Sequence, residues 1–180
     1  MKAAREKYTQ VLDEVLDEVA EKYEELDCRS THPTYEGSNV GIGKRSWPSK
    51  YPDWPSGLWV GHVRLDNVAS DEDEYGPGGE VYIGICNDIK LDMAKVAERL
   101  LHAAKTLSKD EFRRAETWSG KSDAGLWYPL PESREKLLEL LVKDKARGFI
   151  DCMVAHFESL AKFIPIIDEI FEGAAQRASK

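Results

Sequence analysis

Residues 58–86, LWVGHVRLDNVASDEDEYGPGGEVYIGIC, decide the fold of this chain. The stretch begins and ends with apolar runs, at 58–65 and 80–86, in which β-branched residues are frequent. Side chains in the first run alternate between two faces, as they do along a strand. Between the runs lies an acidic segment ending in glycines and a proline, residue types that reverse a chain. The stretch predicts an antiparallel β-hairpin with a long, solvated tip.

Helical periodicity is found on both sides of this hairpin. Apolar residues recur every three or four positions over 3–27, which predicts a long amphipathic N-terminal helix. The same spacing over 91–107 predicts a second helix, and Ser108 with Glu111 forms a capping box that predicts a short third one toward Trp118. Residues 126–130 predict another strand. The prediction is an α+β fold: a small antiparallel sheet of about three strands, covered by helices.

The C-terminal third is expected to be helical. Leucines over 137–141 indicate one helix, and Gly148 separates it from a more hydrophobic one that begins at Phe149. Pro165 should kink or restart this last helix. Residues 29–57, by contrast, combine four prolines with four glycines, which predicts a long loop or a few short edge segments. We therefore expect a single domain over 1–180, divided into an acidic helix (1–28), a Pro/Gly/Trp loop (29–57), the sheet with its helices (58–130) and the C-terminal helices (131–172).

Composition narrows the classes of function. The chain has 180 residues and a net charge of −8, which argues against direct nucleic-acid binding. No apolar run approaches the length of a membrane span, and the N-terminus lacks the pattern of a secretory signal, so a cytoplasmic protein is expected. The cysteines, Cys28, Cys86 and Cys152, are odd in number and far apart, which favours neither a disulfide framework nor a structural zinc site.

The acidic residues gather in two places. Residues 1–28 contain nine acidic against four basic residues, and Asp71, Glu72, Asp73 and Glu74 follow one another in the predicted hairpin tip. Each group has two interpretations, an ordinary solvated surface or a docking surface for a basic partner. Trp and Tyr dominate many protein interfaces, so the 29–57 loop could add an aromatic anchor. The predicted partner-binding residues are Asp71, Glu72, Asp73, Glu74, Asp13, Asp17, Glu21, Trp47 and Trp54.

An alternative set of residues points to nuclease chemistry. Pro52-Asp53 followed by Asp88-Ile89-Lys90 matches the pattern PD…DxK. In nucleases with that signature the carboxylates hold a divalent metal and the lysine polarises the attacking water. Against this reading, Asp88 is an equally good helix cap, and Asp53 lies among prolines and tryptophans rather than on a clear strand.

No cofactor or metal is predicted. The glycine-rich segment 37–45 differs in spacing from a phosphate-binding loop, and Pro48 forbids the helix that should follow it. Cys152 and His156 lie four residues apart on one predicted helix, which gives half of a metal site. Because both border the apolar stripe and no third ligand is apparent nearby, the favoured interpretation is a buried cysteine with a histidine at the edge of the core.

One resemblance concerns the apolar and aromatic pattern. The succession GLWVGHVRL, EVYIGI, a helix, AGLWYPL and FIDCMVAHF resembles the C-terminal accessory region of some PD-(D/E)XK nuclease-like proteins of unknown function. It would cover roughly residues 45–172 and includes no catalytic motif. The resemblance implies a non-catalytic recognition module standing alone, which argues against the site at Asp53, Asp88 and Lys90.

These observations favour a non-enzymatic interaction protein over an enzyme. The leading hypothesis is a regulator or inhibitor, encoded by a phage or mobile element, that uses acidic residues and aromatic side chains to bind the basic surface of a nucleic-acid-binding protein. A metal-dependent nuclease is the alternative. A third hypothesis is a structural domain whose first helix pairs with its own copy.

Overall fold

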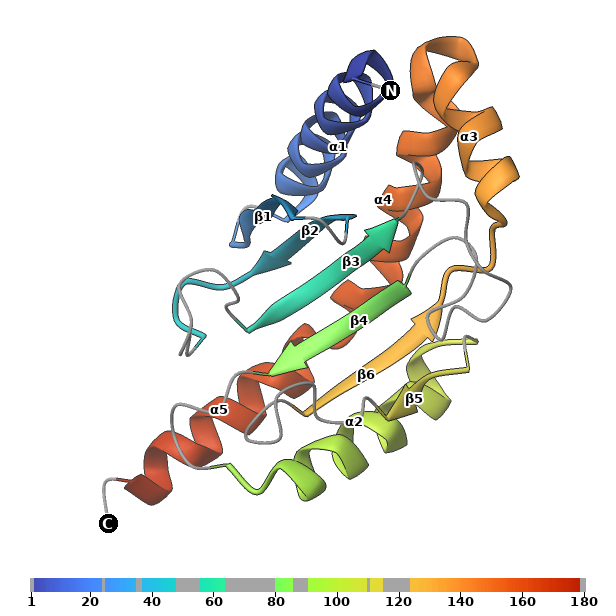
Figure 1. Ribbon diagram of the computed structural model, residues 1–180. Coiled ribbons are helices and arrows are strands. Elements are labelled where there is room, and N and C mark those ends of the chain that lie inside the picture. The colour runs from blue at the N-terminus through green and yellow to red at the C-terminus, as the bar shows by residue number, and fades with distance from the viewer. Residues whose placement is uncertain are drawn as a thin grey trace.

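The chain forms one antiparallel sheet with helices packed against it (Figure 1). The computed structural model describes residues 2–23, 25–34, 37–47, 56–63, 80–85, 91–109, 111–114 and 124–178. Within these residues the sheet has six strands in the order β1-β2-β3-β4-β6-β5. The strands are β1 (Asp27–Thr34), β2 (Gly37–Gly43), β3 (Gly57–Val63), β4 (Glu80–Ile85), β5 (Arg113–Arg114) and β6 (Ala124–Pro129). The helices are α1 (Lys2–Lys22), α2 (Met93–Leu107), α3 (Arg134–Val142), the short 3₁₀ helix η1 (Asp144–Ala146), α4 (Arg147–Ala161) and α5 (Ile164–Ala178).

The α+β class and the hairpin of the 58–86 stretch are confirmed. Strands β3 and β4 pair antiparallel, with Leu58 opposite Ile83 and Trp59 opposite Tyr82. The predicted third strand is also present as β6, which pairs with β4. The tip between β3 and β4, with its four consecutive acids, lies outside the described residues.

The sheet is larger than the expected three strands because part of the 29–57 segment joins it. Strands β1 and β2 form a hairpin, and β2 pairs with β3. The segment resembled a loop because it is rich in proline and glycine. Pro33 lies in β1, an edge strand, where a missing N–H costs least. Gly41 lies opposite Trp59, at a place where the backbone and the indole ring approach closely.

Two helix predictions need correction. Helix α1 ends at Lys22, and the chain enters β1 at Asp27, so the N-terminal helix is shorter than the 3–27 range. Ser108 ends α2 instead of starting a new helix: its backbone is extended, and its N–H donates to the carbonyl oxygen of Ala104. Arg113 then pairs with Trp127 across β5 and β6, where a short helix was predicted. Pairing with the sheet thus overrides the local capping pattern.

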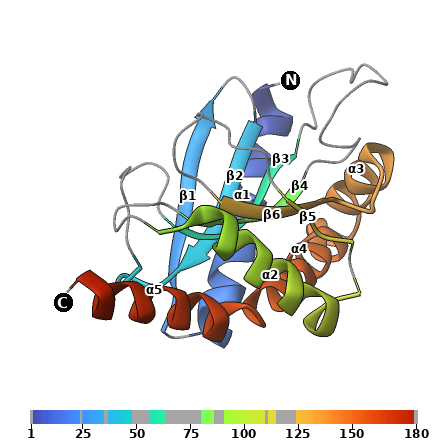
Figure 2. The same ribbon diagram turned by 90° about the horizontal axis from the view of Figure 1, so that it is seen from below.

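One face of the sheet carries the core. Leu58, Ile83 and Leu126 lie side by side in register on β3, β4 and β6, and all are fully buried. They belong to the same apolar cluster as the inner faces of α1, α2, α4 and α5. Figure 2 shows α2, α4 and α5 along this side of the sheet. None of the helices in the described part of the chain combines the length and apolarity that a membrane crossing requires.

The other face carries a row of aromatic side chains. Trp59, Tyr82 and Trp127 are successive cross-strand neighbours on β3, β4 and β6. The Trp59 and Tyr82 rings stack with an interplanar angle of 10°. The guanidinium of Arg113 lies 5.4 Å from the centroid of the Trp127 ring, within range of a cation–π contact. This row lies outside the main apolar cluster, so the sheet is ordered by side chains on both faces.

Local sequence explains how the C-terminal helices begin and end. The Ser133 side chain accepts a hydrogen bond from the N–H of Lys136 and caps α3. Helix α4 ends at Ala161 and α5 begins at Ile164, with Pro165 in its first turn, where a missing N–H is harmless. The predicted restart at Pro165 is thus confirmed. Phe163, at the break between the two helices, is fully buried.

Candidate functional site

Helix α1 has one apolar face and one acidic face. Its inner face buries Val11, Leu12, Val15, Leu16 and Val19 in the core. Its outer face exposes four carboxylates, and the structure gives no ion pair between them and any side chain that it describes. No basic residue occurs between positions 8 and 21. We call this set the acidic face of α1, and its members are Asp13, Glu14, Asp17 and Glu21.

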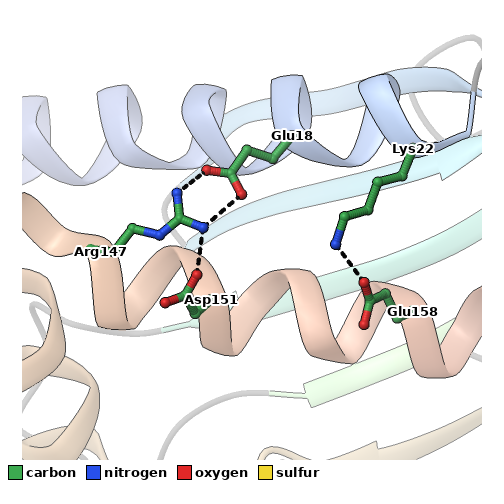
Figure 3. Close-up of polar contacts among 5 residues, drawn as sticks. All are labelled: Glu18, Lys22, Arg147, Asp151 and Glu158. Carbon is green, nitrogen blue, oxygen red and sulfur yellow. Dashed lines mark hydrogen bonds and ion pairs between the residues drawn. The ribbon is translucent and has the colours of Figure 1, made fainter.

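Ion pairs join one side of α1 to the neighbouring helix α4 (Figure 3). The Arg147 guanidinium binds both carboxylate oxygens of Glu18, and its Nη2 also lies 2.6 Å from Asp151 Oδ1. Further along, Lys22 Nζ donates to Glu158 Oε1 at 2.5 Å. Because both pairs advance in the same direction along the two sequences, α1 and α4 run roughly parallel. Exposed ion pairs contribute little stability each, so the buried apolar face mainly determines which face of α1 points outward, and the bridges join the edge of α1 to α4.

The other predicted partner-binding residues are not all available for contact. The prediction that Trp47 binds a partner needs correction. Its side chain is only 3% exposed, and its indole packs near the Phe171 ring of α5. Its Nε1 donates to Asp168 Oδ1 at 2.8 Å, and Lys44 Nζ donates to Asp168 Oδ2 at 2.7 Å. Trp47 therefore belongs to the core in this fold. Trp54 and the acids at 71–74 lie outside the described residues.

Asp168 is expected to stabilise the junction between β2 and α5. Replacing it by alanine leaves the buried indole N–H of Trp47 without its acceptor. Lys44 also loses the Asp168 carboxylate and keeps that of Glu25, 3.2 Å away. We expect the free energy of unfolding to fall by about 1–3 kcal/mol, measured by urea denaturation. Asp168→Asn keeps an acceptor for the indole, so its free energy of unfolding should fall by less than that of Asp168→Ala. Equal losses for the two variants would contradict this role of the Trp47 hydrogen bond.

The nuclease alternative concerns three residues beyond the described part of the chain. Asp53, Asp88 and Lys90 all fall outside the described residues. Their convergence stays a prediction.

A second cluster of polar groups lies between α4 and the segment that leads from β6 to α3. Cys152 and His156 are four residues apart and share one face of α4, and Glu132 reaches them from the turn before α3. The ligand-type atoms of these three residues all lie within 4.8 Å of one another. His156 Nε2 lies 3.2 Å from Glu132 Oε2, and His156 Nδ1 lies 3.0 Å from the hydroxyl of Tyr128 on β6.

The cluster is half-buried, which affects its acid–base properties. The hydrogen bond from His156 lowers the pKa of Glu132, so this carboxylate is ionised near neutral pH. Burial raises the pKa of Cys152 to about 12, and the neighbouring Glu132 charge adds to the effect. In the absence of a cation the cysteine is therefore a neutral thiol, which is a weak nucleophile.

Sequence reasoning found half of this cluster. Cys152 and His156 were recognised by their helical spacing, whereas Glu132 and Tyr128 were not. Glu132 precedes His156 by 24 residues and approaches it because α3, which begins shortly after Glu132, packs against α4. The sequence interpretation that no third ligand is near is thus wrong in space.

No family model, curated protein or solved structure matches this chain. The resemblance to an accessory region of PD-(D/E)XK nuclease-like proteins stays a prediction.

Proposed function

We propose that this protein is a non-enzymatic regulator that binds the basic surface of another protein through the acidic face of α1. The observation that carries the proposal is the arrangement of this helix. Asp13, Glu14, Asp17 and Glu21 form one exposed negative stripe, while the opposite face of the helix is buried in the core. A stripe on a firmly packed helix presents its charges with little loss of backbone entropy on binding.

The charge pattern supports a basic partner. The four carboxylates occupy three successive helical turns without an intervening cation, so their potentials add. Such a surface attracts a partner that carries clustered Lys and Arg, as the binding surfaces of nucleic-acid-binding proteins do. By occupying that surface, the protein would compete with nucleic acid. The predicted resemblance to a stand-alone recognition module agrees with this role.

Charge reversal tests the proposal. We expect the triple variant Asp13→Lys/Asp17→Lys/Glu21→Lys to lose association rate by at least about tenfold, since it replaces long-range attraction by repulsion. The partner is first captured from a lysate with tagged protein and then purified. Association rates are measured by surface plasmon resonance at several salt concentrations, with and without competing DNA.

The matched control reverses three exposed acids elsewhere. Glu98→Lys/Glu111→Lys/Glu172→Lys changes the net charge equally but alters α2, the segment before β5, and α5. Binding by the control should resemble that of the original protein at moderate salt. If the association rate falls equally for both triple variants, the effect comes from net charge and not from the acidic face of α1. If neither does, or if DNA fails to compete, the acidic face of α1 is not the docking surface for such a partner.

A further inference from the structure

We propose that Glu132, Cys152 and His156 form a zinc-binding site on the side of α4 that faces β6 and the start of α3. The inference is independent of the acidic face of α1. It rests on the placement of three different ligand types from two separated segments around one point.

The separations fit a zinc ion. Tetrahedral zinc with bonds of about 2.0–2.3 Å places its ligand atoms roughly 3.3–3.8 Å apart. In the structure His156 Nε2 and Glu132 Oε2 are 3.2 Å apart, and one ligand-type atom from each of the three residues, the Cys152 sulfur included, lies within 4.8 Å of the other two. Bringing the sulfur to its bonding distance thus requires movements of about 1 Å, which side-chain torsions can supply without a change in the backbone.

Tyr128 orients the histidine for this role. Its hydroxyl contacts Nδ1, so the ring directs Nε2 toward Glu132. In a neutral imidazole that donates from Nε2 to the Glu132 carboxylate, Nδ1 is the nitrogen that accepts from the hydroxyl. With zinc on Nε2, the ring proton resides on Nδ1 and is donated to the hydroxyl oxygen, since a tyrosine hydroxyl can donate or accept. Metal-binding histidines characteristically make such a hydrogen bond through their second nitrogen.

Tyr128 is itself held in place. It is 3% exposed, and its ring packs edge-on against Phe112 with centroids 4.8 Å apart. A ligand whose supporting residue belongs to the core loses little freedom on binding metal, which favours affinity.

The donor set favours zinc among the common cations. One sulfur, one imidazole nitrogen and one carboxylate oxygen suit a borderline-soft ion, whereas Mg²⁺ and Ca²⁺ prefer oxygen ligands alone. Binding replaces the thiol S–H bond of Cys152 by a sulfur–zinc bond, and the proton passes to solvent. The side chains of His156 and Glu132 are 12% and 25% exposed, so solvent reaches the edge of the site. Three protein ligands leave a fourth position for water or an external group.

Titration with metal alone tests the site. The parent protein is Cys28→Ser/Cys86→Ser, in which Cys152 is the remaining thiol. We expect one equivalent of Zn²⁺ to bind in isothermal titration calorimetry. Co²⁺ should give a sulfur-to-cobalt charge-transfer absorption with intense tetrahedral ligand-field bands. Adding Cys152→Ser should abolish the charge-transfer band and weaken Zn²⁺ binding by more than about 100-fold, beyond the roughly 10–100-fold typical of losing a supporting residue.

Further variants distinguish the residues that bind the metal from those that do not. Zn²⁺ binding should be weakened by each of the ligand variants Glu132→Gln and His156→Gln. Tyr128→Phe, which removes the supporting hydroxyl, should weaken it by about tenfold. The control His102→Gln changes an exposed histidine on α2 and should leave Zn²⁺ affinity unchanged. Circular dichroism identifies any variant that fails to fold, and Glu132→Gln retains the shape of the site if Cys152→Ser does not fold. Absence of a cobalt–thiolate band in the parent would overturn the proposal. So would equal Zn²⁺ affinity in the parent and Glu132→Gln.

Discussion

Replacing Phe163 by alanine is expected to lower the free energy of unfolding by about 3–5 kcal/mol, the usual cost of emptying an aromatic site in a packed core. Phe163 is fully buried where α4 gives way to α5. Its ring centroid lies 5.2 Å from that of Phe112, which in turn packs against Tyr128. The variant leaves a cavity and removes one aromatic contact. The backbone around it is fixed by two helices, so little collapse can compensate.

Urea denaturation followed by circular dichroism measures this effect. Phe163→Leu keeps most of the side-chain volume, so its free energy of unfolding should fall clearly less than that of Phe163→Ala. The control is Val142→Ala: Val142 is 67% exposed, and its truncation should change stability by less than about 0.5 kcal/mol. A loss below about 1 kcal/mol for Phe163→Ala would mean that the site relaxes around the cavity.

The second large effect is expected at Gly41. A Cβ at this position would lie 2.5 Å from Trp59 Cε3 and 2.9 Å from the carbonyl oxygen of Leu58. Neither neighbour can yield easily, because Trp59 is 1% exposed and stacks on Tyr82, and the carbonyl belongs to the paired strand β3. We expect Gly41→Ala to cost about 3 kcal/mol, the upper part of the range for overpacking, and Gly41→Val to cost more.

Gly84 supplies a matched control for this prediction. It lies near the same indole on β4, but its Cβ would come no closer than 3.6 Å to Trp59, an ordinary contact distance. Gly84→Ala should therefore stay within about 1 kcal/mol of the original protein. Thermal unfolding of the two alanine variants is compared directly. Similar melting temperatures would show that the Trp59 ring moves aside and that the close approach at Gly41 is not a constraint.

Local patterns predicted the elements whose sequence matches their environment. The hairpin of β3 and β4 followed from β-branched alternation, and α1 from its three-and-four spacing. For residues 29–57 the sequence left a long loop or a few short edge segments open, and β1 and β2 fit the second alternative. Their bounds and pairing could not be predicted, because the glycine that permits the Trp59 ring to lie against β2 is also the residue that marks loops. The same limit applies at Ser108, whose capping pattern fits a helix start although it ends one. Pairing of Arg113 with β6 is a tertiary interaction that no local window contains.

The residues of the candidate sites also fall into those that local spacing predicts and those that it does not. The acidic face of α1 was predicted because helical spacing alone determines which residues share it. Burial of Trp47 was not, since its partner Asp168 lies 121 residues away. Glu132 was missed for a related reason: its position opposite Cys152 depends on how the chain turns between β6 and α3. Residues that act together within one helix can be inferred from spacing, whereas those that meet across elements require the fold.

The pairing of α1 with α4 affects how the protein is made. Helix α4 begins at Arg147, 125 residues after α1 ends at Lys22. At about 5–20 residues per second, a ribosome needs roughly 6–25 seconds to synthesise that interval. During this time the apolar side chains of α1 from Val11 to Val19 have left the ribosome without α4, one of the elements that cover them together with β1 and β2. Nascent chains of this protein thus expose an amphipathic segment for seconds, long enough for a chaperone to bind before Arg147 and Glu158 emerge to hold it.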